Sequence, residues 1–214
     1  MSPGKSPADV LFDEIVKRAV TSVLKPLGFR KSAMNFHRRH EKVIQVVNLQ
    51  LSQSSSHDEK IFYVNVGVAF DEICQLANLE ILEKPNEYEC DFRGTRDRLE
   101  CLIDNLPKQW SVQADLDVEL VERQLKAAME QLAFEFASLD GVAAYRTHRW
   151  FDRFRPKQEN AQVLYILGDM DGAFHEVNHL CELFADRKTI NQPKWWIDQL
   201  GLSKLSHILG TRSP

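Results

Sequence analysis

The stretch of sequence that decides the fold runs from Val23 to Phe70: VLKPLGFRKSAMNFHRRHEKVIQVVNLQLSQSSSHDEKIFYVNVGVAF. It starts in the last turn of a predicted helix, which Pro26 and Gly28 end. Three predicted strands follow, separated by a tight turn near Glu41 and by a polar, serine-rich loop. We expect this stretch to form a helix followed by the centre of an antiparallel sheet.

Alternation of apolar and polar residues predicts two different faces for this sheet. In the third strand Phe62, Val64 and Val66 point to one side, and Val47 and Leu49 of the preceding strand match them. The first helix is expected to cover this apolar face. The opposite face gathers amide, basic and aromatic side chains: Asn35, His37, Arg39, Asn48, Gln50, Tyr63 and Asn65. Buried amides need hydrogen-bond partners, so this face is predicted to be a hydrogen-bonded network or a binding surface.

The remaining chain predicts further elements around this sheet. An N-terminal helix starts at the capping box of Ser6 and Asp9. A long helix carries an apolar stripe over residues 118–139. A fourth strand is predicted at residues 88–93, and a short helix at residues 95–106.

The predicted fold class is therefore α+β: an N-terminal helix, an antiparallel sheet of three to four strands, a long helix and a helical C-terminal appendage. The character of the sequence changes near residue 155, where basic and aromatic residues interleave up to a proline and helical segments follow. We predict an α+β domain over residues 1–155 and a helical appendage, a helix hairpin plus short helices, over residues 156–214.

Composition limits the function classes. The 214 residues carry a net charge of −4, which argues against a dedicated nucleic-acid binder. The four cysteines have no CxxC spacing and are typical of reduced thiols in a cytosolic protein. No apolar run approaches the ~20 residues that span a bilayer, and the N-terminal segment lacks the apolar run of a signal peptide. We expect a cytoplasmic protein without a membrane partner, for which self-association into a homo-oligomer stays open.

Several spaced segments carry a resemblance to a known family: LKPLGFRK at residues 24–31, Asn35-Phe36-x-Arg38, Val47-Asn48-Leu49-Gln50, Tyr63-Val64-Asn65-Val66-Gly67, Cys90-x-x-Arg93-Gly94 and Phe136-x-Ser138-Leu139. Together they resemble the bacterial family catalogued as domain of unknown function 4304, over roughly residues 8–155. The resemblance implies an α+β domain of bacterial origin and implies no particular reaction. Some members of that family look like accessory or immunity-type proteins, which points to a protein partner.

One string matches a catalytic pattern: His175-Glu176-Val177-Asn178-His179 is an H-E-x-x-H motif. Two histidines one helical turn apart can bind one Zn²⁺, and the glutamate can act as general base on metal-bound water. Asp198 is the best candidate for a third ligand. The apolar residues of this segment lie on the other side of the predicted helix, so the two histidines are expected to face solvent, as on an ordinary solvated helix face.

Two basic stretches indicate a different partner. Residues 25–42 and 145–157, the first and second basic stretches, gather arginines and lysines, and the second interleaves them with aromatic residues. Such a pattern can contact phosphates and stack on bases. It is also typical of an amphipathic helix that buries its aromatic rings and solvates its arginines. The acidic net charge favours this second interpretation.

The leading hypothesis is a non-enzymatic cytoplasmic module that binds another protein and needs no cofactor. The residues expected to form its binding face are Asn48, Gln50, Tyr63, Asn65 and Arg93, with Arg96 as a further source of charge. The first alternative is a zinc-dependent hydrolase with His175, His179 and Asp198 as ligands and Glu176 as the catalytic base. The second alternative is a nucleic-acid-binding protein that uses the two basic stretches.

Overall fold

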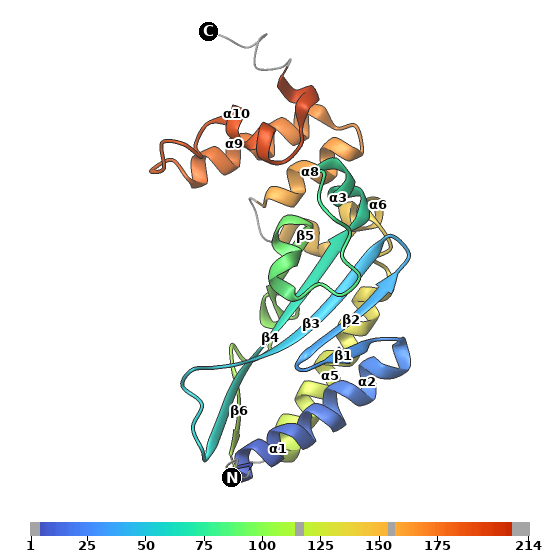
Figure 1. The fold of residues 1–214 in the computed structure, drawn as a ribbon, viewed down its shortest axis with the longest axis vertical. Helices are drawn as coiled ribbons and strands as arrows, with labels where there is room; N and C mark the ends of the chain where they lie inside the picture. Colours follow the sequence, from blue (N-terminus) through green and yellow to red (C-terminus); the bar gives the residue numbers. More distant parts are fainter. Residues whose placement is uncertain (1–4, 114–117, 154–156, 207–214) are drawn as a thin grey trace.

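The computed structural model describes residues 5–113, 118–153 and 157–206, and within them it shows the predicted α+β class (Figure 1). Six strands in these ranges form one antiparallel sheet in the order β1-β2-β3-β4-β5, and β6 pairs with the first part of β4. The strands are β1 Arg30–Ser32, β2 Asn35–His40, β3 Val43–Leu51, β4 Glu59–Phe70, β5 Gly94–Arg98 and β6 Trp110–Gln113. The observed sheet is thus larger than the predicted three to four strands.

Helices cover the sheet and continue beyond it. Before the sheet come α1 Pro7–Ile15, the π-helix η1 Val16–Thr21, α2 Ser22–Leu24 and the 3₁₀-helix η2 Lys25–Leu27. Between and after its last strands come α3 Asp71–Leu76, the 3₁₀-helix η3 Glu87–Phe92, α4 Leu99–Leu102 and α5 Val118–Ala137. The C-terminal part holds α6 Val142–Thr147, α7 Arg149–Arg153, α8 Gln158–Ile166, α9 Met170–Leu183, α10 Pro193–Gln199 and η4 Ser203–Leu205. No helix in the described ranges has the length and apolar character needed to cross a membrane.

The N-terminal helix begins and ends as the sequence predicts. Ser6 Oγ accepts a hydrogen bond from the backbone N–H of Asp9 (3.1 Å), and Asp9 Oδ2 accepts one from the backbone N–H of Ser6 (3.0 Å). This capping box satisfies two backbone donors at the start of the helix. At the other end Gly28 has a φ of 88°, a left-handed conformation that a residue without Cβ adopts without strain.

The pairing of β3 with β4 sets the two faces of the sheet. The register runs from Val43 opposite Phe70 to Leu51 opposite Phe62. The first face carries Phe62 and the other buried valines and phenylalanines of the same parity, as the alternation predicts. α1, α2 and α5 pack against this face and lie side by side along it in Figure 1. The second face carries the residues of opposite parity, Asn65 among them.

One polar side chain on the first face joins the sheet to α5. Gln45 is fully buried, and its Nε2 donates to the backbone carbonyls of Phe136 (2.6 Å) and Leu139 (3.3 Å). Its Oε1 accepts a hydrogen bond from Arg38 Nε at 2.7 Å. The last carbonyls of a helix have no partner within the helix. Gln45 therefore satisfies the C-terminal end of α5 while its own amide stays paired.

The elements after β4 differ from the prediction. Residues 88–93 do not form a strand but belong to the 3₁₀-helix η3 and its C-terminal cap. Asn86 and Glu89 cap the start of η3 with reciprocal hydrogen bonds of 3.1 and 2.7 Å. The predicted helix at residues 95–106 is reduced to α4, because its first residues form β5. Polar residues make up most of β5, so it lacks the apolar alternation by which a strand is predicted.

η3 covers part of the second face. Gly67 of β4 lies directly beneath Cys90, and a Cβ at position 67 would lie 2.7 Å from the Cys90 Sγ. Ile44, Val46 and Ala69 join Cys90 in a small buried cluster at this contact. The second face is therefore divided into an apolar strip under η3 and polar areas beyond it.

The C-terminal helices share the hydrophobic core of the sheet. The Tyr145 ring packs on Phe70 of β4 with centroids 5.2 Å apart, and on Phe151 at 5.6 Å. The buried cluster continues from these rings into α8, α9 and α10. Figure 1 shows α8–α10 at the end of the molecule opposite α1. The predicted boundary between residues 155 and 156 lies outside the described residues.

We expect Gly94→Ala to destabilise the fold, because a Cβ at position 94 would lie 2.0 Å from the Val68 carbonyl oxygen. A backbone oxygen cannot move aside as a side chain can, so β5 has to separate from β4. The expected loss in free energy of unfolding is roughly 1–3 kcal/mol, measured by urea denaturation. Gly141→Ala is the matched control, because its Cβ would meet only the Glu72 carboxylate at 3.1 Å. Equal stability of the two variants would contradict the close approach of β4 and β5.

Candidate functional site

A row of amide side chains crosses the second face of the sheet. Asn35, Asn48 and Asn65 lie opposite one another on β2, β3 and β4. Asn48 Nδ2 donates to Asn35 Oδ1 at 2.8 Å. Asn65 Nδ2 donates to Asn48 Oδ1 at 3.2 Å and to Gln50 Oε1 at 3.1 Å. These four residues, which we call the amide row, hold one another in a single orientation.

Two arginines stacked on tyrosines extend this surface toward β5. The Arg98 guanidinium lies 3.8 Å from the centre of the Tyr63 ring. The Arg96 guanidinium lies 4.6 Å from the centre of the Tyr88 ring, and its Nε donates to Asp91 Oδ1 at 2.7 Å. Stacking on an aromatic face holds a guanidinium in a defined plane. Both guanidinium groups are therefore held in defined orientations by neighbouring side chains.

These side chains surround an open hollow of about 360 Å³, which we call the polar hollow. Its lining comes from β3, β4, η3 and β5: Gln50, Asn65, Tyr88, Arg96, Asp97 and Arg98. The Gln50 Nε2 donates to the Tyr88 hydroxyl at 3.4 Å and so connects the amide row to the rim. Four of the predicted binding residues are thus brought together on one surface: Asn48, Gln50, Tyr63 and Asn65.

Arg93 is not part of this surface. Its Nε donates to the Glu80 carbonyl (3.1 Å) and its Nη1 to the Glu89 carbonyl (3.2 Å), so it holds the chain around η3. Arg98 and Tyr88, which the sequence analysis did not single out, occupy the surface instead. Arg98 alternates with Arg96 along β5, and this spacing of two is the signal by which it could have been found.

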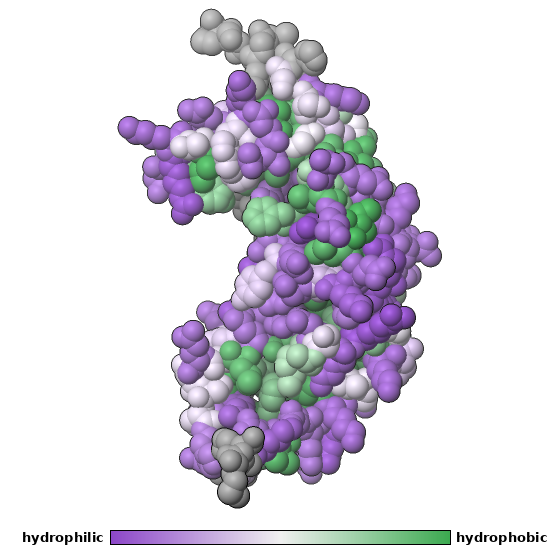
Figure 2. Space-filling model, in the orientation of Figure 1, coloured by the Kyte–Doolittle hydropathy of each residue, from purple (hydrophilic) through white to green (hydrophobic). Residues whose placement is uncertain are grey.

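A second hollow of about 240 Å³ adjoins the first and shares Arg96 with it. Its apolar wall, in the region of α9 and α10, consists of Leu180, Leu183, Phe184 and Trp196. Its polar side includes Lys157 and Glu159, and burial raises the pKa of the Glu159 carboxyl. Figure 2 shows the surface hollowed between these helices and the sheet. We call this feature the apolar hollow.

The HEVNH string lies on α9, with its histidines toward solvent. His175 is exposed and His179 is half-buried, and their ring centroids are 4.2 Å apart. Glu176 is only 1% exposed and so lies on the buried side of the helix. Asp198 is an exposed residue of α10. Across the described ranges, no group of three or more His, Cys, Asp or Glu side chains is placed to hold a metal ion.

The second basic stretch faces inward. Tyr145, Trp150 and Phe151 are at most 1% exposed, so their rings are not available to stack on bases. Arg149 lies 2.6 Å from the Glu135 carboxylate. These three aromatic residues therefore belong to the core, as the amphipathic interpretation predicts, whereas Phe154 lies outside the described residues.

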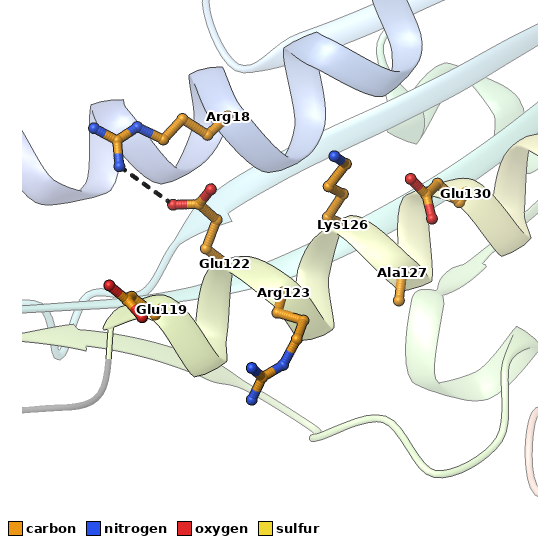
Figure 3. Close-up of a pocket in the computed structure, with 7 residues that line it drawn as sticks. All are labelled: Arg18, Glu119, Glu122, Arg123, Lys126, Ala127 and Glu130. Atoms are coloured by element: carbon orange, nitrogen blue, oxygen red, sulfur yellow. Dashed lines mark ion pairs between the residues drawn. The ribbon is translucent and has the colours of Figure 1, made fainter.

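A hollow of about 550 Å³ between η1 and α5 is lined by surface charges of both signs (Figure 3). Its lining residues are Arg18, Glu119, Glu122, Arg123, Lys126, Ala127 and Glu130. Arg18 Nη1 lies 3.6 Å from Glu122 Oε2, and Figure 3 shows Arg123 directed away from this pair. The charges do not converge on one point, so we assign this hollow no binding role.

The chain belongs to the family described as Domain of unknown function (DUF4304), whose model matches residues 20–153. The matched range contains the whole amide row and both stacked arginines. It ends before α8, so the helices that form the apolar wall lie outside it. No curated protein and no solved structure matches the chain.

We expect Asn65→Ala to weaken the fold more than Asn35→Ala. Asn65 is 4% exposed and donates to two side chains, so its removal leaves Asn48 and Gln50 oxygens without that donor. The expected cost is about 1–3 kcal/mol in free energy of unfolding. Asn35 accepts one bond at the half-buried end of the row, so its loss should cost about 1 kcal/mol or less. Urea denaturation measures the free energy of unfolding of both variants. Equal losses would contradict the arrangement in which Asn65 supplies two hydrogen bonds and Asn35 accepts one.

Proposed function

We propose that the chain is a non-enzymatic cytoplasmic module that binds an acidic, partly apolar segment of another protein. The contact surface is the polar hollow together with the apolar hollow. The observation that carries the proposal is the fixed row of amides and stacked arginines, which meets an apolar wall at Arg96. The four cysteines are free thiols, which fits a reducing compartment.

Arg98 supports an acidic partner. Its guanidinium is held over the Tyr63 ring and forms no ion pair within 4 Å among the described residues, although its charge acts on the Glu100 carboxyl. Guanidinium donors bind a carboxylate through two parallel hydrogen bonds. Arginine and tyrosine are also enriched among the residues that dominate protein interfaces. A carboxylate of the partner placed against Arg98 completes this donor set.

The apolar hollow supports a protein segment, rather than a small ion, as the partner. Leu183 is 56% exposed, and beside it the Phe184 and Trp196 rings pack with centroids 5.7 Å apart. Tyr88 and Phe92 of η3 add exposed aromatic rings. Apolar groups that gather beside a polar rim are typical of protein interfaces. A segment with an apolar side chain close to a carboxylate fits both hollows.

The lining of the two hollows supports binding rather than catalysis. Among the described residues that line them there is no Ser, Thr, Cys or His to act as nucleophile or base. Their three carboxylates are engaged in ion pairs: Asp91 with Arg96 at 2.7 Å, Asp97 with Lys157, and Glu159 with Lys157 at 3.6 Å. Such pairs stabilise the shape of the surface that the partner contacts.

A zinc-dependent hydrolase is the second candidate function. One observation favours it, because the His175 and His179 rings lie 4.2 Å apart on one side of α9. A catalytic zinc site uses three protein ligands and a general base near the metal-bound water. Glu176, the residue that the motif assigns as base, is buried instead. The protein-binding function therefore has the better support.

We expect protein purified without a histidine tag to hold no stoichiometric zinc after exposure to zinc and dialysis. Two histidines without a third ligand bind the metal weakly. Elemental analysis measures the metal, with the His175→Ala/His179→Ala double variant as the control. One zinc per chain in the wild type, lost in the double variant, would make the hydrolase the better candidate.

We expect a photo-crosslinking amino acid at position 88 to capture a protein partner from the native host. Tyr88 is 52% exposed on the rim of the polar hollow, so it can be replaced without loss of core packing. Position 134 is the matched control, because Phe134 is 80% exposed on α5, which packs on the first face. Arg98→Glu should reduce capture from position 88 by about tenfold or more. Capture from both positions, or capture that Arg98→Glu leaves unchanged, would contradict the proposal.

A further inference from the structure

Another hollow lies at the β1–β2 edge of the second face, away from the polar hollow over β3–β5. It measures about 360 Å³, and its lining is mostly basic: Gly28, Arg30, His37, Arg38, Arg39, Glu83 and Lys84. Arg30 pairs with His37 across β1 and β2, so both side chains lie on the same face. Glu83 is the one acidic residue among the described residues that line it. We call this feature the basic hollow.

His37 is the residue that points to a ligand. The residue is 6% exposed and lines the hollow, and no group in the described ranges hydrogen-bonds either of its ring nitrogens. Neither nitrogen is among the fully buried unpaired atoms of the described residues, so the ring presents its polar atoms at the surface of the hollow. Burial lowers the pKa of His37, and the positive charges of Lys84 and Arg30 lower it further. His37 can therefore form hydrogen bonds with a group from outside the chain, and the cations around it favour an anionic group.

Two of the four cations that line the hollow are already engaged. Arg39 lies 2.9 Å from the Asp71 carboxylate, and Arg38 donates to a side-chain amide (2.7 Å) and a backbone carbonyl (2.8 Å). Arg30 and Lys84 are exposed and have no hydrogen-bond or ion-pair partner among the described residues. The hollow therefore gathers two unpaired cations and one unused imidazole from three segments, namely β1, β2 and the loop before η3.

We infer that the basic hollow binds the phosphoryl group of a small phosphorylated molecule, between Arg30, His37 and Lys84. A phosphoryl dianion presents three strong acceptor oxygens, which match donors from three separate segments. A carboxylate has two oxygens in one plane and suits a single guanidinium better. The volume of about 360 Å³ lies in the range of small-ligand sites, roughly 300–1,000 Å³. It leaves room for the group that carries the phosphate.

A nucleic-acid backbone offers the same phosphate chemistry, but the surroundings favour a single small ligand. Proteins that bind nucleic acid contact several successive phosphates along a continuous basic surface. The basic hollow is bounded by Glu83, and Tyr145, Trp150 and Phe151 of the second basic stretch are buried in the core. The net charge of −4 also opposes a polyanion.

An NMR titration of the His37 imidazole tests the inference on the full chain. Its resonance is assigned with His37→Asn, and its pKa is measured in chloride and then in inorganic phosphate at equal ionic strength. We expect phosphate to raise the pKa of His37 by about one unit, because a bound dianion favours the imidazolium form. A pKa of His37 that is the same in both salts would overturn the inference.

Two double variants separate a defined site from general charge attraction. Arg30→Ser with Lys84→Ser removes the two unpaired cations and should abolish the effect of phosphate. Both residues are exposed, so the thermal unfolding midpoint should be kept, which shows that the variant still folds. Lys17→Ser with Lys188→Ser removes the same charge at two exposed positions elsewhere and should leave the effect intact. If phosphate changes the pKa of His37 equally in the two double variants, the inference is overturned.

Two further probes identify the source of the phosphoryl group. Glycerol phosphate should shift the His37 resonance at a lower concentration than inorganic phosphate does, because the hollow also holds the carrying group. A single-stranded oligonucleotide should produce no shift beyond that of inorganic phosphate. If the oligonucleotide binds more tightly than glycerol phosphate and its affinity falls steeply with salt, the inference of a small-molecule ligand is wrong and nucleic acid is the ligand. Failure of glycerol phosphate to shift His37 would likewise contradict a phosphomonoester site.

Discussion

The register between β3 and β4 is the constraint on which the rest of the structure depends. Side chains alternate along a strand, so a slip of one residue would exchange the two faces of the sheet. The apolar series would then meet solvent, and Asn48 and Asn65 would enter the core under α5. Burial of Val47, Val64 and Val66 on the first face holds the register against this slip. Packing on one face thereby aligns the hydrogen-bonded amides on the other.

Burial of one face of a strand gives an alternation of apolar and polar residues in the sequence. This alternation made the centre of the fold predictable. The alternation in β3 and β4 identifies both faces and correctly brings Asn48 and Asn65 together. β5 has no apolar alternation, because most of its residues are polar. One of them, Asp97, has its partner Lys157 sixty residues further along the chain, where local patterns cannot reveal it. η3 does have a local signal, the capping box of Asn86 and Glu89, but alternation alone does not reveal it. Arg93 holds the chain around η3 and so does not reach the surface that the alternation predicts for it. The amide row under the polar hollow was predictable, whereas its walls depend on contacts between distant segments.

The helices beyond the family match complete the surface that we propose for binding rather than stand apart from it. Leu180 and Trp196 form one wall of the apolar hollow, whose other wall includes Arg96 of β5. Lys157 joins the two parts, because its ammonium donates to Thr95 Oγ1 at 3.0 Å and also pairs with an acidic residue of β5. The part of the fold that the family model matches supplies amides and guanidinium groups, and the C-terminal helices supply the apolar contact. A segment that fills both hollows contacts both parts of the chain.

Lys84 and Tyr88 belong to one short segment, yet they line different hollows. The same segment continues to Cys90, which is seated against Gly67 with no space left beneath it. This close contact prevents the segment from moving closer to the sheet. It can be displaced only parallel to the sheet or away from it. Either movement would change the shape of the basic hollow and of the polar hollow, because residues of this segment line both. η3 and the residues before it thus form a boundary that the two hollows share, so a ligand that displaced this segment from one hollow would by linkage change the affinity of the other.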